Sequence, residues 1–201
     1  MRLAFCLPGQ QFTDGFVRSW TKTVLHFERK GVKFMNAIAY SSNVTAARNI
    51  VVGKKEILER EKYDYMMWID SDTVWDPEDI EKLIAAKKDI ISGLVPIDWD
   101  GSVGVGNFAA DGFLTWMKKT TIPDTKPFEV GYAGMAFMLV RRGIFEELGY
   151  PYFVQVPVEW EGKKILYGED VTWCLRVKEL GYKIWAHPGV VLGHQKVFTL
   201  Y

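Results

Sequence analysis

The sequence has little cysteine and no long apolar run, and both shortages restrict what the protein can be. Cys6 and Cys174 are the two cysteines among 201 residues, too few for a disulfide framework or a cysteine-based zinc cluster. We therefore expect a reducing, cytoplasmic setting. No apolar stretch approaches the ~18 residues of a membrane-spanning helix, and residues 1–7 are too short for the core of a signal peptide. No transmembrane segment is expected.

The chain also lacks an excess of either charge, because Lys and Arg number 25 and Asp and Glu number 25. Proteins that bind nucleic acid by neutralising phosphates usually carry a basic face. The balance therefore argues against nucleic acid as a partner and gives no reason to expect an anionic membrane surface. Hydrophobic residues make up 48% of the chain, which excludes a disordered protein. The length favours one domain.

Strand and helix patterns alternate in the first half of the chain. Continuous apolar runs predict strands over residues 2–7, 33–40, 65–69 and 90–95. Helical spacing predicts a helix capped by Asp14 with Val17 on its apolar face, a second after residues 41–43, and a third starting at Asp76-Pro77. Alternation of this kind predicts an α/β fold with a helix-covered parallel sheet.

The second half is less regular. We expect a polar, Gly-rich loop over 98–111, a long strand over 132–140 and a helix over 169–180. Two short strands are expected over 183–186 and 190–192. The glycines of 101–106 precede no capped helix, so we interpret them as a flexible loop that orders over a ligand rather than as a phosphate cradle.

Acidic residues follow the third predicted strand, where parallel sheets bind ligands. Asp70 and Asp72 stand two residues apart at its end, a spacing that suits a hard divalent cation. Helix capping is the alternative, but Asp76 already precedes Pro77 at the capping position. We therefore interpret Asp70 and Asp72 as metal-binding.

Two further candidates stay open on residue type alone. Glu169 and Asp170 either offset the dipole of a helix or supply a carboxylate that takes a proton from a hydroxyl. His194 is either a ligand or a structural histidine. Trp99, between two aspartates, is our candidate ring for stacking on a sugar.

The order of these segments resembles family 2-type glycosyltransferases with the GT-A fold. The resemblance is carried by Thr45-Ala46-Ala47-Arg48-Asn49, Trp68-Ile69-Asp70-Ser71-Asp72, Gly131-Tyr132-Ala133-Gly134, Gly168-Glu169-Asp170 and a late His194. It implies a mostly parallel central sheet with a Rossmann-like N-terminal half and a mixed C-terminal half. It also implies one catalytic domain over 1–201, with a nucleotide- and metal-binding half over 1–97 and an acceptor-binding half over 98–201.

The resemblance implies a metal-dependent enzyme that moves one sugar from a nucleoside-diphosphate sugar, by default a UDP-sugar, to a hydroxyl acceptor such as a glycan. Mn²⁺ is favoured over Mg²⁺ because the ligands are mixed carboxylate and imidazole. The implied metal ligands are Asp72, His194 and Asp70. Asp170, with Glu169 beside it, resembles the catalytic base. The implied donor-binding residues are Pro8, Gln10, Arg48, Asp70, Ser71, Asp72 and Gly134, and Met135 borders the acceptor pocket.

The sequence departs from the family pattern after its first strand, where residues 8–11 form a compact segment without a basic residue. Seven residues follow His194, so we expect that any C-terminal lid or acceptor domain is either missing or part of a longer protein.

Three other functions remain as alternatives. Asp70-Ser71-Asp72-Thr73-Val74 also fits the nucleophile motif of haloacid dehalogenase-like phosphatases, with Ser92 and Lys163 as later motifs, although that motif normally follows the first strand. A nucleotidyltransferase would need a basic Gly-rich loop after the first strand. A non-catalytic module that binds sugar nucleotides or glycans would retain the fold without turnover.

Overall fold

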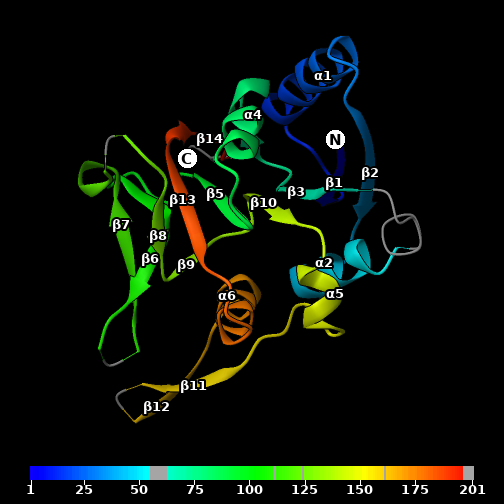
Figure 1. Ribbon diagram of the computed structural model, residues 1–201. Helices are drawn as coiled ribbons and strands as arrows, with labels where there is room; N and C mark the ends of the chain where they lie inside the picture. Colours follow the sequence, from blue (N-terminus) through cyan, green and yellow to red (C-terminus); the bar gives the residue numbers. More distant parts are fainter. Residues whose placement is uncertain (55–62, 111, 124, 161, 197–201) are drawn as a thin grey trace, which may run out of the picture.

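The computed structural model describes residues 1–54, 63–110, 112–123, 125–160 and 162–196. At its centre lies a sheet of seven strands in the order β2-β1-β3-β10-β5-β13-β8 (Figure 1). Strands β1, β2, β3, β5 and β13 run in one direction, and β10 and β8 run against them. The expected α/β fold with a mostly parallel sheet and a mixed second half is therefore confirmed. The seven strands are β1 (Arg2–Pro8), β2 (Lys33–Ala39), β3 (Tyr65–Ile69), β5 (Ile90–Leu94), β8 (Phe128–Val130), β10 (Phe137–Arg141) and β13 (Ile184–Val191).

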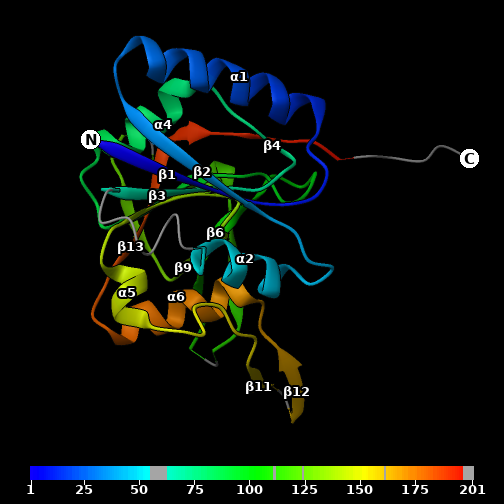
Figure 2. The same ribbon diagram turned by 90° about the vertical axis from the view of Figure 1, so that its right-hand side faces the viewer.

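Helices cover both faces of this sheet, as Figure 2 shows from the side. One face packs against α1 (Asp14–Arg29) and α4 (Pro77–Ala85), and the other against α2 (Val44–Val52), α5 (Ile144–Leu148) and α6 (Glu169–Glu179). Because side chains alternate along a strand, β1 sends Phe5 into the core under α1 and Cys6 into the core under α2. Its continuous apolar sequence is explained by burial on both faces.

The first helix differs from its prediction in its N-cap residue and in which of its residues face the core. Thr13, not Asp14, is the N-cap, and its hydroxyl oxygen accepts from the backbone N–H of Phe16. Val17 is 51% exposed, whereas Ser19 and Thr23 are buried. Their hydroxyl oxygens accept from the backbone N–H and the indole N–H of Trp75, at 3.0 and 2.9 Å. The buried stripe therefore contains polar residues, which a search for apolar spacing does not detect.

Three small sheets complete the fold beside the central one (Figure 1). The first has the order β7-β6-β9, the second pairs β4 with β14, and the third is a hairpin of β11 and β12 that extends beside α6. Their bounds are β4 (Thr73–Val74), β6 (Ser102–Phe108), β7 (Leu114–Lys118), β9 (Tyr132–Ala133), β11 (Pro157–Trp160), β12 (Lys163–Leu166) and β14 (Gly193–His194), with a 3-10 turn at Lys119–Thr121.

The predictions for the second half need correction. The flexible loop expected over 98–111 is wrong, because residues 102–105 lie in β6 and are buried. The single strand expected over 132–140 is two strands, β9 and β10, and the two segments expected over 183–192 form one irregular strand, β13. In β6 the glycines allow close packing: a Cβ on Gly106 would lie 2.0 Å from the carbonyl oxygen of Thr115.

Candidate active site

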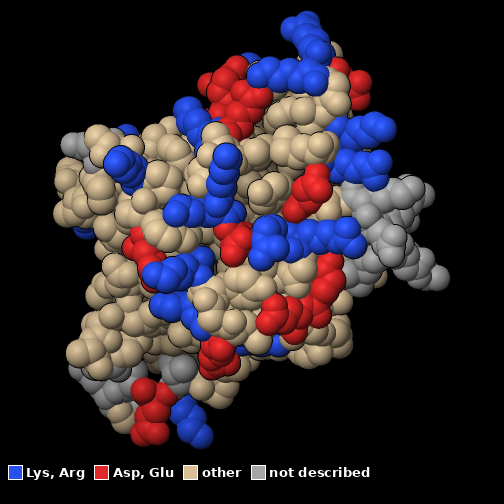
Figure 3. Space-filling model, in the orientation of Figure 1, with Lys and Arg blue, Asp and Glu red and all other residues tan. Residues whose placement is uncertain are grey.

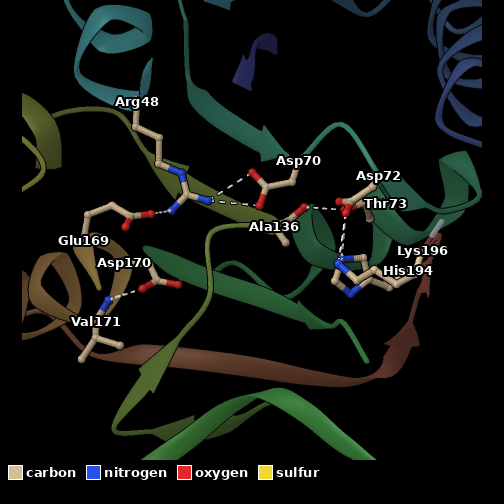
Figure 4. Close-up of polar contacts among 10 residues, drawn as sticks. All are labelled: Arg48, Asp70, Asp72, Thr73, Ala136, Glu169, Asp170, Val171, His194 and Lys196. Atoms are coloured by element: carbon tan, nitrogen blue, oxygen red, sulfur yellow. Dashed lines mark hydrogen bonds and ion pairs between the residues drawn. The ribbon is translucent and has the colours of Figure 1, made fainter. Parts of the chain in front are cut away.

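The predicted site residues meet where β3 ends. Asp70 follows β3 directly, and its backbone N–H donates to the carbonyl oxygen of Ala136, which precedes β10, at 3.0 Å. From there the chain turns into β4, whose antiparallel partner β14 carries His194 to the same edge. Arg48 reaches this edge from α2, and Glu169 and Asp170 reach it from the first turn of α6 (Figure 4).

Arg48 is the buried centre of an ion-pair cluster. Its side chain is 4% exposed, and Nη2 donates to both carboxylate oxygens of Asp70 at 3.1 Å each. Nη1 donates to Glu169, which is 6% exposed (Figure 4). Burial opposes the charge of Arg48, but Asp70, Glu169 and Asp170 together raise its pKa. Burial raises the pKa of Glu169, against the opposing effect of Arg48. Arg48 therefore fixes the position of Asp70, and Glu169 supports Arg48.

A second cluster joins Asp72 and His194. Nε2 of His194 lies 3.0 Å from Oδ2 of Asp72, and Nδ1 lies 2.7 Å from the carbonyl oxygen of Pro96. Since a carbonyl only accepts, Nδ1 donates to Pro96, and Nε2 faces the carboxylate of Asp72. A cation beside this pair offsets the charge of the carboxylate. Lys196 supplies one, with Nζ 3.2 Å from Asp72 Oδ2 and also in contact with His194 Nε2.

The geometry of this pair suits a metal ion as well. Ligand atoms 3.0 Å apart correspond to neighbouring positions around an ion with bonds of about 2.1 Å. Asp70 faces Arg48 instead, with both of its oxygens engaged. Among the described residues no three His, Cys, Asp or Glu side chains gather as a ligand group. Asp72 and His194 thus offer two ligands, and water or a bound ligand would supply the others.

Asp170 borders a cavity of about 130 Å³ that also touches the other two clusters. Its Oδ1 accepts from the backbone N–H of Val171 at 2.8 Å. A Cβ on Gly134 would lie 3.5 Å from Oδ2, so the glycine leaves the carboxylate accessible. Met135, which is buried, forms part of the wall. The cavity also contacts Arg48, Asp70, Ser92, Gly93, Val95, Ile97, Gly104, Trp116, Ala136 and His194.

A larger hollow of about 450 Å³ lies at the ends of β1 and β2. It is lined by Pro8, Gln10 and Ser71, which the resemblance implies as donor-binding residues, and by Tyr40 and Ser41, which were not among the candidates. Its remaining lining residues are Gly9, Gln11, Ser42, Val44 and Ala47. Every one of these side chains is uncharged, which suits the nucleoside part of a ligand more than its phosphates.

Trp99 is 86% exposed and borders a groove with Ile97, His194 and Lys196. It therefore lies beside the Asp72–His194 cluster. Sequence reasoning also missed Lys196 and Trp116. Lys196 stands two positions after His194 in an extended segment, a spacing that places side chains on one side. Trp116 borders the Asp170 cavity from β7, whose sequence contains none of the motifs that indicated a functional residue.

Comparison with known proteins places this geometry in context. The model of glycosyl transferase family 2 matches residues 47–149, a range that contains Arg48, Asp70, Asp72 and Met135. No curated protein sequence gives a significant match. Among solved structures, A197 from STIV is 17% identical, with a TM-score of 0.61 over 100% of this chain and 97% of that chain.

Two larger enzymes share the same fold. GalNAc-T7 with UDP, GalNAc and Mn²⁺ is 12% identical, with a TM-score of 0.53 over 96% of this chain and 43% of that chain. The catalytic domain of Drosophila beta1,4galactosyltransferase 7 in complex with xylobiose is 13% identical, with a TM-score of 0.54 over 98% and 76%. At such low identity these likenesses show a shared fold alone.

Proposed function

Because this chain belongs to glycosyl transferase family 2 and has a GT-A-like fold, we propose that it transfers one sugar from a UDP-sugar to a hydroxyl acceptor. In this proposal Asp72 and His194 hold Mn²⁺, and Asp170 is the general base. The carrying observation is the convergence of Asp70, Asp170 and His194 on one cavity. A phosphatase with Asp70 as nucleophile is disfavoured, since both of its oxygens accept from Arg48.

Asp72 and His194 hold the metal in this proposal. Their facing atoms fit two neighbouring ligand positions, and the mixed carboxylate and imidazole set suits Mn²⁺ better than Mg²⁺. A bound ion would offset the charge that develops on the departing diphosphate. Nζ of Lys196 contacts both ligand atoms, so the lysine would have to move aside for the ion to bind. GalNAc-T7, which shares the fold, is described with UDP and Mn²⁺, and this is the reason to test Mn²⁺ first.

The hollow formed by Pro8, Gln10, Tyr40 and Ser71 receives the nucleoside of the donor. Ser71 lies between Asp70 and Asp72, so a ligand placed there continues towards both clusters. Asp70 contacts the ribose or the base, held by Arg48. Arg48 is a positioning residue in this scheme, because its own charge is already matched by Asp70 and Glu169.

Asp170 is preferred to Glu169 as the base because Glu169 is buried against Arg48, whereas Asp170 borders the cavity. In the transfer step the acceptor oxygen forms a bond to the anomeric carbon. The bond from that carbon to the diphosphate oxygen breaks, and UDP leaves with the electron pair. The hydroxyl proton passes to Asp170. Gly134 and Met135 border the sugar, and Trp99 contacts the acceptor at the rim.

Thermal unfolding with nucleoside diphosphates, with and without Mn²⁺, tests the donor and metal sites. UDP at about 100 times its dissociation constant should add ~2.7 kcal/mol of stability when Mn²⁺ is present. Asp72→Ala and His194→Ala should abolish the Mn²⁺-dependent part. Asp89→Ala, which removes an aspartate paired with Arg141 away from the site, should behave as the unchanged protein. Equal UDP affinity with and without Mn²⁺ would contradict the proposed metal site. If no nucleoside diphosphate stabilised the protein, the proposed nucleotide-sugar donor would be contradicted.

A further inference from the structure

A second exposed tryptophan, Trp116, stands in the wall of the cavity that Asp170 borders. It lies in β7, a strand without a buried residue, and is itself 43% exposed. The cavity places it together with Asp170 and Gly134. An exposed indole beside the proposed base is a ligand-facing surface rather than part of the hydrophobic core.

The ring is held in place by its neighbours across the small sheet. Gly106 of β6 pairs with Trp116 on one side and with Tyr132 of β9 on the other. Residues directly opposite each other project on the same face, so the two rings meet above a residue that has no side chain. Their centroids are 5.0 Å apart and their planes are inclined by 77°. Tyr132 is fully buried, so it fixes the indole and the indole is ordered before any ligand arrives.

The side chains that line the cavity are of two chemical kinds. Those of Trp116, Ile97 and Val95 are apolar. Arg48, Asp70, Asp170 and His194 carry the polar groups. A pyranose ring has the same division, with C–H groups on its flat face and hydroxyls around its edge. An acyl chain would match the apolar side chains but leave the polar groups without partners, which is costly in a closed site.

We propose that the acceptor is a glycan whose reacting sugar stacks its C–H face on Trp116, so that one hydroxyl points to Asp170. This inference rests on the proposed function, because it names the acceptor of the same site. Trp116 is then the residue that gives the acceptor site its preference for sugars over other alcohols.

Transfer assays with two variants of Trp116 test the stacking. Trp116→Phe keeps a flat ring, and Trp116→Leu keeps an apolar side chain without a flat face. The probes are methyl pyranosides and simple disaccharides as acceptors, with hexanol and a serine peptide as non-sugar hydroxyls. Trp116→Leu should raise KM for the best sugar acceptor about tenfold, and Trp116→Phe should stay within about threefold. Trp185→Leu, at a distant pocket that contains Lys88, is the matched control and should leave the KM for the acceptor unchanged.

UDP affinity with Mn²⁺ is measured in parallel and should be the same in all variants, because Trp116 does not line the nucleoside hollow. A Trp116→Leu enzyme with unchanged acceptor KM would overturn the proposal. Transfer by the unchanged protein to hexanol or the peptide but to no sugar would overturn it too. Loss of UDP binding in both Trp116 variants, with lowered thermal stability, would assign the ring a structural role and also overturn it. Failure of the proposed function looks different, since the unchanged protein itself would then neither bind nor cleave a nucleotide sugar.

Discussion

Glu169 and Asp170 are adjacent in sequence but have different surroundings. Glu169 is buried against Arg48, which lies 121 residues earlier in the chain. Asp170 borders the cavity. The sequence showed two acids at a helix start, and their type and spacing are compatible with either role. Burial separates the two, and burial depends on an arginine from a remote helix, which is why local sequence reasoning left the pair unresolved.

Asp170→Asn should therefore lower the rate of transfer by about 10²–10⁴-fold with nearly unchanged donor affinity, because a general base acts on the acceptor proton and not on UDP. Steady-state kinetics and UDP titration measure the two quantities.

Glu169→Gln should instead lower the free energy of unfolding by on the order of 3 kcal/mol, because it leaves buried Arg48 with one charged partner fewer. Transfer lost in Glu169→Gln at full stability, and retained in Asp170→Asn, would reverse the two roles.

Among the elements, β3 could be predicted from the sequence pattern and β6 could not. β3 was predicted with the bounds it has, because its apolar run Tyr65–Ile69 is local information. β6 was expected to be a loop because glycines at 101, 104 and 106 are typical of loops. In the structure Gly106 is needed where β7 and β9 approach the strand. That requirement comes from neighbours that are distant in sequence.

Gly106→Ala and Gly104→Ala form a matched pair on this strand. A Cβ on Gly106 would lie 2.0 Å from a backbone oxygen of β7, so Gly106→Ala should cost about 1–3 kcal/mol of stability. A Cβ on Gly104 would meet its nearest atom at 3.5 Å, an ordinary contact, so Gly104→Ala should be nearly neutral. Urea denaturation compares the two free energies of unfolding. Equal values would show that β7 moves away freely and that the close approach has no energetic consequence.

On the scale of the whole molecule, the two halves expected from the sequence share one sheet. β10 comes from the second half, yet it lies between β3 and β5 of the first. Basic and acidic side chains are interspersed over the face drawn in Figure 3, in keeping with the balanced composition. Among the described residues no helix is long and apolar enough to cross a membrane.

The shared sheet predicts that the chain unfolds as one unit. Removal of β10 would separate β3 from β5, so neither half retains a complete core alone. Urea denaturation followed by tryptophan fluorescence and by far-UV circular dichroism should therefore give coincident transitions. Trp68 in β3 and Trp173 in α6, both buried, report on the first and second half respectively. Two separate transitions would mean that residues 1–97 and 98–201 fold independently.

The pairing of β4 with β14 also orders events during synthesis. Asp72 and His194 are 122 residues apart in the chain. At about 5–20 residues per second, the carboxylate leaves the ribosome about 6–24 s before its imidazole partner. β10 emerges within that interval, so the central sheet can join β3 to β5 only after Asp72 has already left the ribosome. The edge that carries the proposed metal pair is therefore completed last, when residue 194 emerges and β14 pairs with β4.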